Sequence, residues 1–217
     1  YVIDDACIIQ RPNDAFPGWR YCPRGLWGAS VGTSLLAVGA DANHIAALDA
    51  AAAGLVVVDP ASAHVAHWQL GGASPADPAA DPAVDGAVAS AVDIDVRGGV
   101  VVLALRGARL VERRTADGTL LGRFKSYDTP DALALGPDGS VYVLGHGGWI
   151  TRFAADGTVL DTWSLPGAGA TPHDLAVDGA GRVHVAWQRL AANGRNDTHQ
   201  GGGIWVYAPD ADVPPVV

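Results

Sequence analysis

The chain has 217 residues, of which 49% are hydrophobic and 17% are charged, and its formal net charge is −9. This composition is typical of a globular protein and excludes a disordered chain. The excess of acidic residues argues against nucleic acid as a partner, because a phosphate-binding surface needs a surplus of Lys and Arg. No apolar run approaches the roughly 20 residues that a membrane helix needs, so insertion into a membrane is not expected.

The N-terminal segment, residues 1–33, contains both cysteines of the chain, Cys7 and Cys22. They flank the stretch RPNDAFPGWRY. A disulfide that closed this loop would contribute about 3 kcal/mol in the chain-entropy model and would imply an oxidising compartment, whereas two unrelated thiols are the alternative. The run YVIDDACII predicts a strand, which either completes the last of the repeated sheets that follow or belongs to a degenerate additional sheet.

The rest of the chain repeats one pattern four times. The segment ERRTADGTLLGRF is followed by a close copy, TRFAADGTVLDTW, and the matched residues Asp117 and Asp156 lie 39 residues apart. Further copies are recognised on both sides of this pair. The four repeats cover about residues 34–70, 92–126, 131–165 and 173–211.

Each copy contains four short runs rich in Val, Leu, Ile and aromatic residues, separated by turn signals. The alternation in SVYVLG and RVHVAW has a period of two residues, which is typical of strands with a buried face. The Asp-Gly pair in ADGT suits a hairpin in which Gly adopts a positive φ. Four-stranded units that repeat at about 40 residues predict a β-propeller, because one such sheet cannot bury both of its faces alone. We therefore expect an all-β fold of four-stranded antiparallel blades.

Two segments, TPHDLAVDGAGRVHVAW and PDALALGPDGSVYVLGHGGWITRFAADG, resemble NHL-repeat β-propellers. The resemblance covers about residues 34–209 and implies a propeller fold. It does not select an activity, because such propellers serve as binding platforms, scaffolds, lyases and lactonases. NHL-type rings usually have six blades and only four are recognised here. We expect a small closed ring of four or five blades rather than an open piece of a larger ring, because an open ring leaves two blade faces exposed.

Two long insertions are expected on one face of the propeller. In an antiparallel blade, the connection to the next blade and the loop between the second and third strands emerge on the same face. Residues 71–91 form such a connection, in which Pro75, Pro78 and Pro82 exclude a continuous helix, and residues 188–203 form such a loop. Loops of this length are often functional, although insertions also accumulate where a fold tolerates them. This face is therefore the candidate binding surface.

The same face should carry the residues that enter the first strand of each blade and line the mouth of a central channel. In the alignment these positions hold Ser34, Val92, Asp131 and His173, followed by Leu35, Asp93, Ala132 and Asp174. The loops between second and third strands add further polar residues. The candidate binding residues are Asp93, Asp131, His146, His173, Asp174, Asn196 and His199.

Asp and His side chains that converge at a channel mouth suit a divalent cation such as Zn²⁺ or Ca²⁺. Asp131 and His173 are the candidate ligands, and the resemblance supports this position because related propeller enzymes use a metal near the channel. Those enzymes present several matched ligands, whereas Ser34 and Val92 stand at equivalent positions here. A polar residue at a strand start is more often solvated. The sequence therefore predicts no obligatory cofactor and keeps the metal site as an alternative.

The leading hypothesis is a non-enzymatic β-propeller that binds another protein or a glycan through the face with loops 71–91 and 188–203. Its expected setting is secreted, cell-surface or assembly-associated, and the Ala/Asp/Gly/Val-rich composition is compatible with a bacterial source of high GC content. One alternative is a metal-dependent lyase or lactonase with His146 as acid or base at the channel mouth. Another is a structural subunit of a filament or a viral tail.

Overall fold

The computed structural model describes residues 2–4, 7–10, 19–21, 35–49, 54–59, 64–69, 91–165, 170–190 and 199–208. Every regular element in this part of the chain is a β-strand, and consecutive strands of each sheet pair antiparallel. The described residues include no helix that is long and apolar enough to cross a membrane. The all-β prediction is confirmed.

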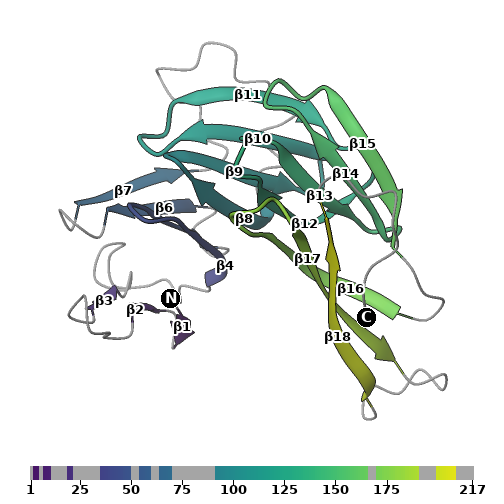
Figure 1. Ribbon diagram of the computed structural model, residues 1–217. Coiled ribbons are helices and arrows are strands. Elements are labelled where there is room, and N and C mark those ends of the chain that lie inside the picture. Colours follow the sequence, from purple (N-terminus) through teal and green to yellow (C-terminus); the bar gives the residue numbers. More distant parts are fainter. Residues whose placement is uncertain are drawn as a thin grey trace.

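Four sheets correspond to the four repeats and are called blades 1 to 4 (Figure 1). Blade 1 contains β4 (Leu35–Ala40), β5 (Ile45–Asp49), β6 (Gly54–Asp59) and β7 (His64–Gln69). Blade 2 contains β8 (Ala91–Arg97), β9 (Val100–Leu105), β10 (Leu110–Thr115) and β11 (Leu120–Lys125). Blade 3 contains β12 (Pro130–Leu135), β13 (Val141–Gly145), β14 (Trp149–Phe153) and β15 (Val159–Ser164). In the described residues blade 4 contains β16 (Ala170–Val177), β17 (Val183–Leu190) and β18 (His199–Tyr207).

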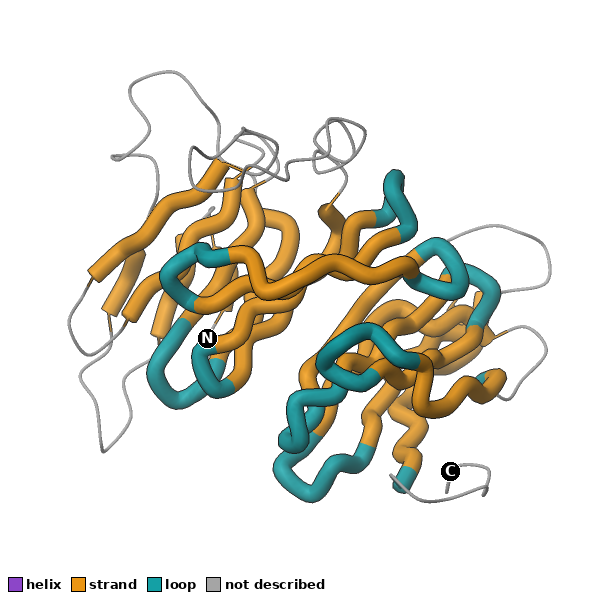
Figure 2. Tube along the Cα trace, turned by 90° about the horizontal axis from the view of Figure 1, so that it is seen from above, coloured by secondary structure: helices purple, strands orange, loops and turns teal. Residues whose placement is uncertain are grey.

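The first strands of the blades, called the inner strands, lie side by side (Figure 1), and the described residues between strands are loops and turns (Figure 2). Strand β8 contacts β4 on one side and β12 on the other, and β12 also contacts β16. Within each blade the later strands follow in chain order away from the inner strand. This radial arrangement is that of a propeller, because each sheet offers its two faces to its two neighbours.

Apolar side chains of neighbouring blades pack into three core clusters. One cluster joins blades 1 and 2, the second joins blades 2 and 3, and the third joins blades 3 and 4. Between blades 2 and 3, for example, Val102 and Val111 pack with Leu133 and Phe153. The period-two pattern of the sequence supplies these contacts, because alternate residues of one strand point to opposite neighbours.

The Asp-Gly turns of blades 2 and 3 have the conformation that the sequence predicts. Gly118 and Gly157 adopt φ values of 94° and 88°. The carboxylates of Asp117 and Asp156 accept hydrogen bonds of 3.1 and 2.9 Å from the backbone amides two residues later. A side chain at either glycine would be strained at this φ, so the repeated pair has a conformational cause.

The ring of blades is open in the described part of the chain. Strand β16 packs against β12 but has no comparable contact with β4. The expectation of a small closed ring is therefore wrong for these residues. A regular repeat determines how neighbouring sheets pack, whereas closure also depends on the angle between the sheets, which the repeat does not specify.

The strands near the N-terminus form a sheet of their own. Strands β1 (Val2–Asp4), β2 (Cys7–Gln10) and β3 (Trp19–Tyr21) pair with one another in this order. In the described residues β1 does not pair with β18 to complete blade 4. The alternative, in which residues 1–33 contribute to an additional sheet, agrees with this pairing.

Several predictions from the sequence concern residues outside the described part. Cys22, and with it the predicted disulfide to Cys7, lies there, as do loop residues 71–90 and Asn196. The insertion at 188–203 is only partly a loop, because β17 continues to Leu190 and β18 begins at His199. The two strands extend beyond the expected length of the repeat and pair up to these residues.

Candidate binding site at the channel mouth

The starts of the inner strands and the loops between second and third strands lie on one face, as the sequence predicts. Asp131 is near the start of β12, Arg106 follows β9 and His146 follows β13. The carboxylate of Asp131 contacts the side chains of both Arg106 and His146. The backbone amide of His146 also donates a 2.8 Å hydrogen bond to the carbonyl of Thr129. We call this end of the inner strands the channel mouth.

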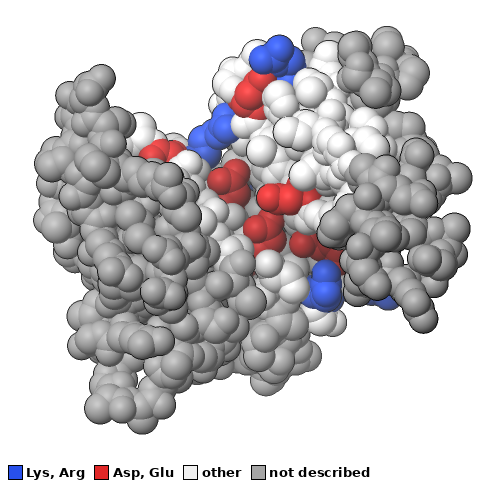
Figure 3. All heavy atoms as spheres, turned by 90° about the horizontal axis from the view of Figure 1, so that it is seen from below, with Lys and Arg blue, Asp and Glu red and all other residues white. Residues whose placement is uncertain are grey.

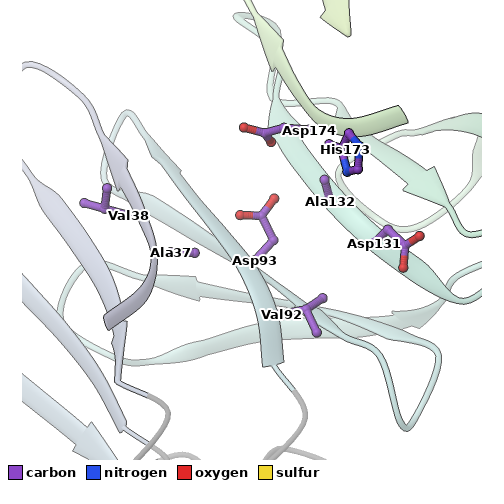
Figure 4. A pocket seen from close by; sticks show the side chains of 8 residues that line it. All are labelled: Ala37, Val38, Val92, Asp93, Asp131, Ala132, His173 and Asp174. Carbon is purple, nitrogen blue, oxygen red and sulfur yellow. The ribbon is translucent and has the colours of Figure 1, made fainter. Parts of the chain in front are cut away.

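A cavity of about 370 Å³ opens between the inner strands of all four blades. It is lined by Ala37, Val38, Val92, Asp93, Asp131, Ala132, His173 and Asp174 (Figure 4). The carboxylates of Asp93 and Asp174 point into it, and Asp131 is directed away from them. Acidic side chains also gather in the hollow at the centre of the molecule in the view from below (Figure 3).

Asp93 links blades 2 and 3 and borders the cavity. Its Oδ2 accepts a 2.7 Å hydrogen bond from the backbone amide of Leu133 on β12. Burial raises the pKa of Asp93 to about 7; the amides of Leu133 and Ile94 oppose this rise, and the negative charges of Asp174 and Asp95 add to it. The carboxyl group is therefore partly protonated at neutral pH, which is unusual for Asp.

Asp95, two residues after Asp93 on β8, also links blade 2 to blade 3. Its Oδ2 accepts a 2.8 Å hydrogen bond from the amide of Leu135. Burial raises its pKa, opposed by backbone amides and by the charge of Arg97. Arg97, two residues further, donates a 2.6 Å hydrogen bond to the carbonyl of Val177 on β16. Alternate residues of β8 thus connect this strand to two other inner strands.

Asp174 supplies the second carboxylate of the cavity from blade 4. Its Oδ1 accepts a 2.8 Å hydrogen bond from the amide of Leu175. Burial raises the pKa of Asp174, and the hydrogen bond from this amide opposes the rise. Asp93 and Asp174 come from blades 2 and 4, which are not neighbours, and the negative charge of Asp174 contributes to the raised pKa of Asp93. Two like charges in one cavity are most stable beside a positive charge.

A charged group at the rim fixes the loops beside the cavity. Arg106 donates to Oδ1 of Asp131, and Nδ1 of His146 lies 2.9 Å from Oδ2 of the same carboxylate. Asp131 is mostly buried, whereas the His146 side chain is 77% exposed. Asp131 therefore orients an imidazole that solvent can reach.

The predicted metal ligands do not converge with further donors. In the part of the chain that the structure describes, no three His, Cys, Asp or Glu side chains are grouped so that they could hold a metal ion. Asp131 is bonded to Arg106 and His146, and His173 is exposed. Assignment of Asp131 and His173 as metal ligands stays a prediction from the sequence.

Two aromatic side chains project from the same face. Tyr127, in the connection from β11 to β12, is 79% exposed, and Trp149, at the start of β14, is 46% exposed. In contrast, Trp163 is partly buried against the cluster between blades 3 and 4. Exposed Tyr and Trp are frequent in binding surfaces because they bury a large area with little loss of side-chain freedom.

The structure brings most of the predicted site residues together. Asp93, Asp131, His173 and Asp174 line one cavity and His146 stands at its rim. Nothing is described of Asn196 or of the side chain of His199. In blade 1 the cavity is lined by Ala37 and Val38. The strand pairing of β4 is irregular between Leu35 and Ala37, and the pairing of β8 is irregular at the equivalent place, just before Asp93. Ala37 is therefore the residue of blade 1 that corresponds to Asp93. The sequence repeat predicts Leu35 at this position, which is two residues too early.

Arg106 and Asp95 lie beside the candidate site, and neither is among the residues predicted from the sequence. Arg106 has no counterpart of the same type in the other repeats, so periodicity does not reveal it. Asp95 has a signal, since it follows Asp93 by two residues on a predicted strand and must share its face.

Several solved structures are similar to this chain. Virginiamycin B lyase from Staphylococcus aureus, crystallised as an inactive variant with quinupristin, is 14% identical, with 83% of this chain and 57% of that chain covered and a TM-score of 0.53. The Swd1 β-propeller domain from Myceliophteria thermophila is 9% identical, with coverages of 70% and 47% and a TM-score of 0.50. A protein of unknown function from Desulfotomaculum acetoxidans is 16% identical, with coverages of 86% and 60% and a TM-score of 0.55.

The chain thus spans about half to three-fifths of the length of these proteins. No protein-family model matches it, and no curated protein does. At this level of identity the similarity concerns the fold alone. The four radial blades and the likeness to known propellers together identify the fold as a β-propeller.

Proposed function

We propose that the protein is a non-enzymatic binding module that recognises a partner through the channel mouth. The observation that carries this proposal is the cavity between the inner strands, into which Asp93 and Asp174 point from different blades. A protein partner is favoured over a glycan, because two carboxylates select a cationic group and proteins present Lys and Arg.

The walls of the cavity suit the aliphatic part of such a side chain. Ala37, Val38, Val92 and Ala132 provide apolar surface beside the two carboxylates. A Lys or Arg side chain combines a hydrocarbon stem with a charged end, so it can contact both kinds of wall. Tyr127 and Trp149 on the same face offer additional contact area for the rest of the partner.

The scaffold is suited to recognition because strands hold the cavity in place. Hydrogen bonds from β12 amides fix the carboxylates of Asp93 and Asp95, and Asp131 ties two loops together. A preorganised site loses little conformational entropy when a ligand binds. A relation to NHL-repeat propellers and a secreted or cell-surface setting are part of this proposal.

A second candidate function is an enzymatic one, a propeller lyase or lactonase. It is supported by the pair of Asp131 and His146, since a carboxylate that orients an exposed imidazole is a common arrangement for general acid–base catalysis. Turnover of a simple aromatic lactone that is lost in His146→Ala would favour this candidate over the binding module.

The binding proposal is tested with acetylated tripeptides in an NMR titration of the labelled protein. We expect Gly-Arg-Gly and Gly-Lys-Gly to shift the amide signals of the cavity residues, whereas neutral Gly-Gln-Gly does not. The double variant Asp93→Asn/Asp174→Asn should weaken binding at least about tenfold, because hydrogen bonds to charged groups contribute about 1.5–3 kcal/mol each. Asp156→Asn, in an exposed turn, is the matched control and should bind normally.

The affinity should also depend on pH. A cation binds the ionised form of Asp93, whose pKa is about 7, so affinity should rise between about pH 5.5 and pH 8 and lose this dependence in Asp93→Asn. Equal binding of the neutral peptide, or unchanged binding by the double variant, would refute the proposal. Binding of a neutral oligosaccharide at Trp149 instead would identify a glycan partner.

A further inference from the structure

The outer face of blade 4 exposes positions that are buried in the neighbouring blade. In blade 3, Leu144 pairs with Ile150, and both side chains are fully buried against blade 4. In blade 4 the equivalent pair is Ala186 and Ile204, as their place in the strand ladder shows. Ala186 is exposed and Ile204 is 62% exposed. Two positions that are buried between sheets in blade 3 are therefore exposed in blade 4.

The inner strand of blade 4 shows the same contrast. Ala134 on β12 is 3% exposed and packs in the cluster between blades 3 and 4. Its equivalent on β16, Ala176, is exposed. Val206, two residues after Ile204 and on the same face, is only half-buried. The exposed residues Ala176, Ala186 and Ile204, together with the half-buried Val206, define what we call the open blade face.

At the opposite end of the row of blades, two apolar side chains of β5 are buried. Ile45 and Ala47 of β5 alternate with Ala46 and Leu48, which pack against blade 2, so they point to the other face of blade 1. Both are 0% exposed. Among the described side chains at this end, Ile45 and Ala47 therefore offer no exposed apolar surface to a head-to-tail contact with the open blade face of another molecule.

We infer that the open blade face is the interface of a two-fold symmetric dimer, in which it packs against the same face of a second copy. A two-fold contact needs only one self-complementary surface, and the described residues offer this one. Alternate apolar positions of two sheets then interdigitate as they do between blades 2 and 3.

Two opposite charges of blade 4 complement each other in this arrangement. Asp174 lies in the middle of β16, and Arg182 lies beyond the C-terminal end of that strand, just before β17. If the two-fold axis lies in the plane of the face and perpendicular to the strands, it reverses the strand direction, and Asp174 of one copy then approaches Arg182 of the other. Arg182 is 56% exposed and uses Nε for its 2.7 Å bond to Asp178, which leaves its terminal nitrogens for a second carboxylate.

Sedimentation velocity of the 217-residue chain tests this inference. We expect the weight-average mass to rise with concentration from 22.2 kDa toward twice that value. Ile204→Arg should raise the dissociation constant of the dimer at least tenfold, because it places a charge in the apolar contact. Leu160→Arg, a similar change at a 51% exposed residue of β15, should leave the dimer intact.

A wild-type chain that stays at 22.2 kDa at the highest concentration would overturn the inference, as would equal behaviour of the two variants. Circular dichroism checks that both variants fold. If the inference is overturned in this way, a different sheet, such as a further blade of a longer polypeptide, is the better occupant of the open blade face. Because Asp174 also borders the cavity, the peptide titration is repeated on Ile204→Arg. Retained peptide binding by a monomer would separate the two proposals.

Discussion

Replacement of Gly39 by Ala is expected to destabilise the protein by about 2–3 kcal/mol. Gly39 lies in β4, beside the backbone of β8. A Cβ atom at this position would lie 2.6 Å from the Cα of Asp95 and 2.9 Å from the amide nitrogen of Val96. Both atoms belong to the backbone, so no side-chain rotation relieves the contact. Blades 1 and 2 must move apart, and the packing between them weakens.

Chemical denaturation measures this loss as a lower midpoint. Gly122→Ala in β11 is the matched control, since a Cβ there meets nothing within 4 Å. Its free energy of unfolding should stay within about 0.5 kcal/mol of the wild type. Equal stability of the two variants would show that β4 and β8 do not approach as described.

Replacement of Glu112 by Ala should cost about 3–5 kcal/mol, the typical effect of removing one partner of a buried ion pair. Glu112 is 1% exposed and bonds the guanidinium groups of Arg114 and Arg123, the second at 2.6 Å. Both Arg side chains are only 16% exposed. Without the carboxylate, two positive charges remain close together and poorly solvated.

Thermal or urea unfolding of Glu112→Ala measures this effect. Arg182→Ala, compared at a concentration at which the chain is monomeric, is the control, because its ion pair with Asp178 is at the surface and such pairs contribute at most about 1 kcal/mol. We expect the wild type to be the most stable and Arg182→Ala to be slightly less stable. Glu112→Ala should be much less stable than both. A loss below about 1 kcal/mol for Glu112→Ala would contradict a buried charge cluster in blade 2.

The blades could be predicted from the sequence because their signals are local and repeated. The Asp-Gly turn at Asp117 recurs at Asp156, and each copy places alternate apolar residues on both faces of a sheet. The first repeat is less regular, and its inner strand was assigned two residues too early. A shift of two residues keeps the same side chains on the same face, so the apolar pattern does not reveal the error.

The number of blades in the ring could not be predicted in the same way. Closure depends on the angle between neighbouring sheets, and this angle depends on the side-chain volumes in every interface. A contact between sheets far apart in the sequence leaves no periodic signal. Because the ring is open in the described residues, Ile204 is exposed, whereas the equivalent residue of blade 3, Ile150, is buried.

The candidate site was predicted in part. Asp93, Asp131, His173 and Asp174 occupy equivalent strand starts, so a radial arrangement of the repeats is sufficient to bring them together. Their orientation was not predictable, because irregular pairing precedes the inner-strand residue in each blade and turns Asp131 away from the cavity. The partner of Asp131, Arg106, comes from another blade and has no repeated counterpart.

Carbon-detected NMR titration of the Asp carboxyl groups tests most directly whether blades 2 and 4 bring two carboxylates to one cavity. We expect Asp93 to titrate near pH 7 in the wild type and at a lower pH in Asp174→Asn, because the neighbouring negative charge is gone. An Asp93 that titrates near the ordinary value of 3.8, or that does not respond to Asp174→Asn, would contradict this convergence.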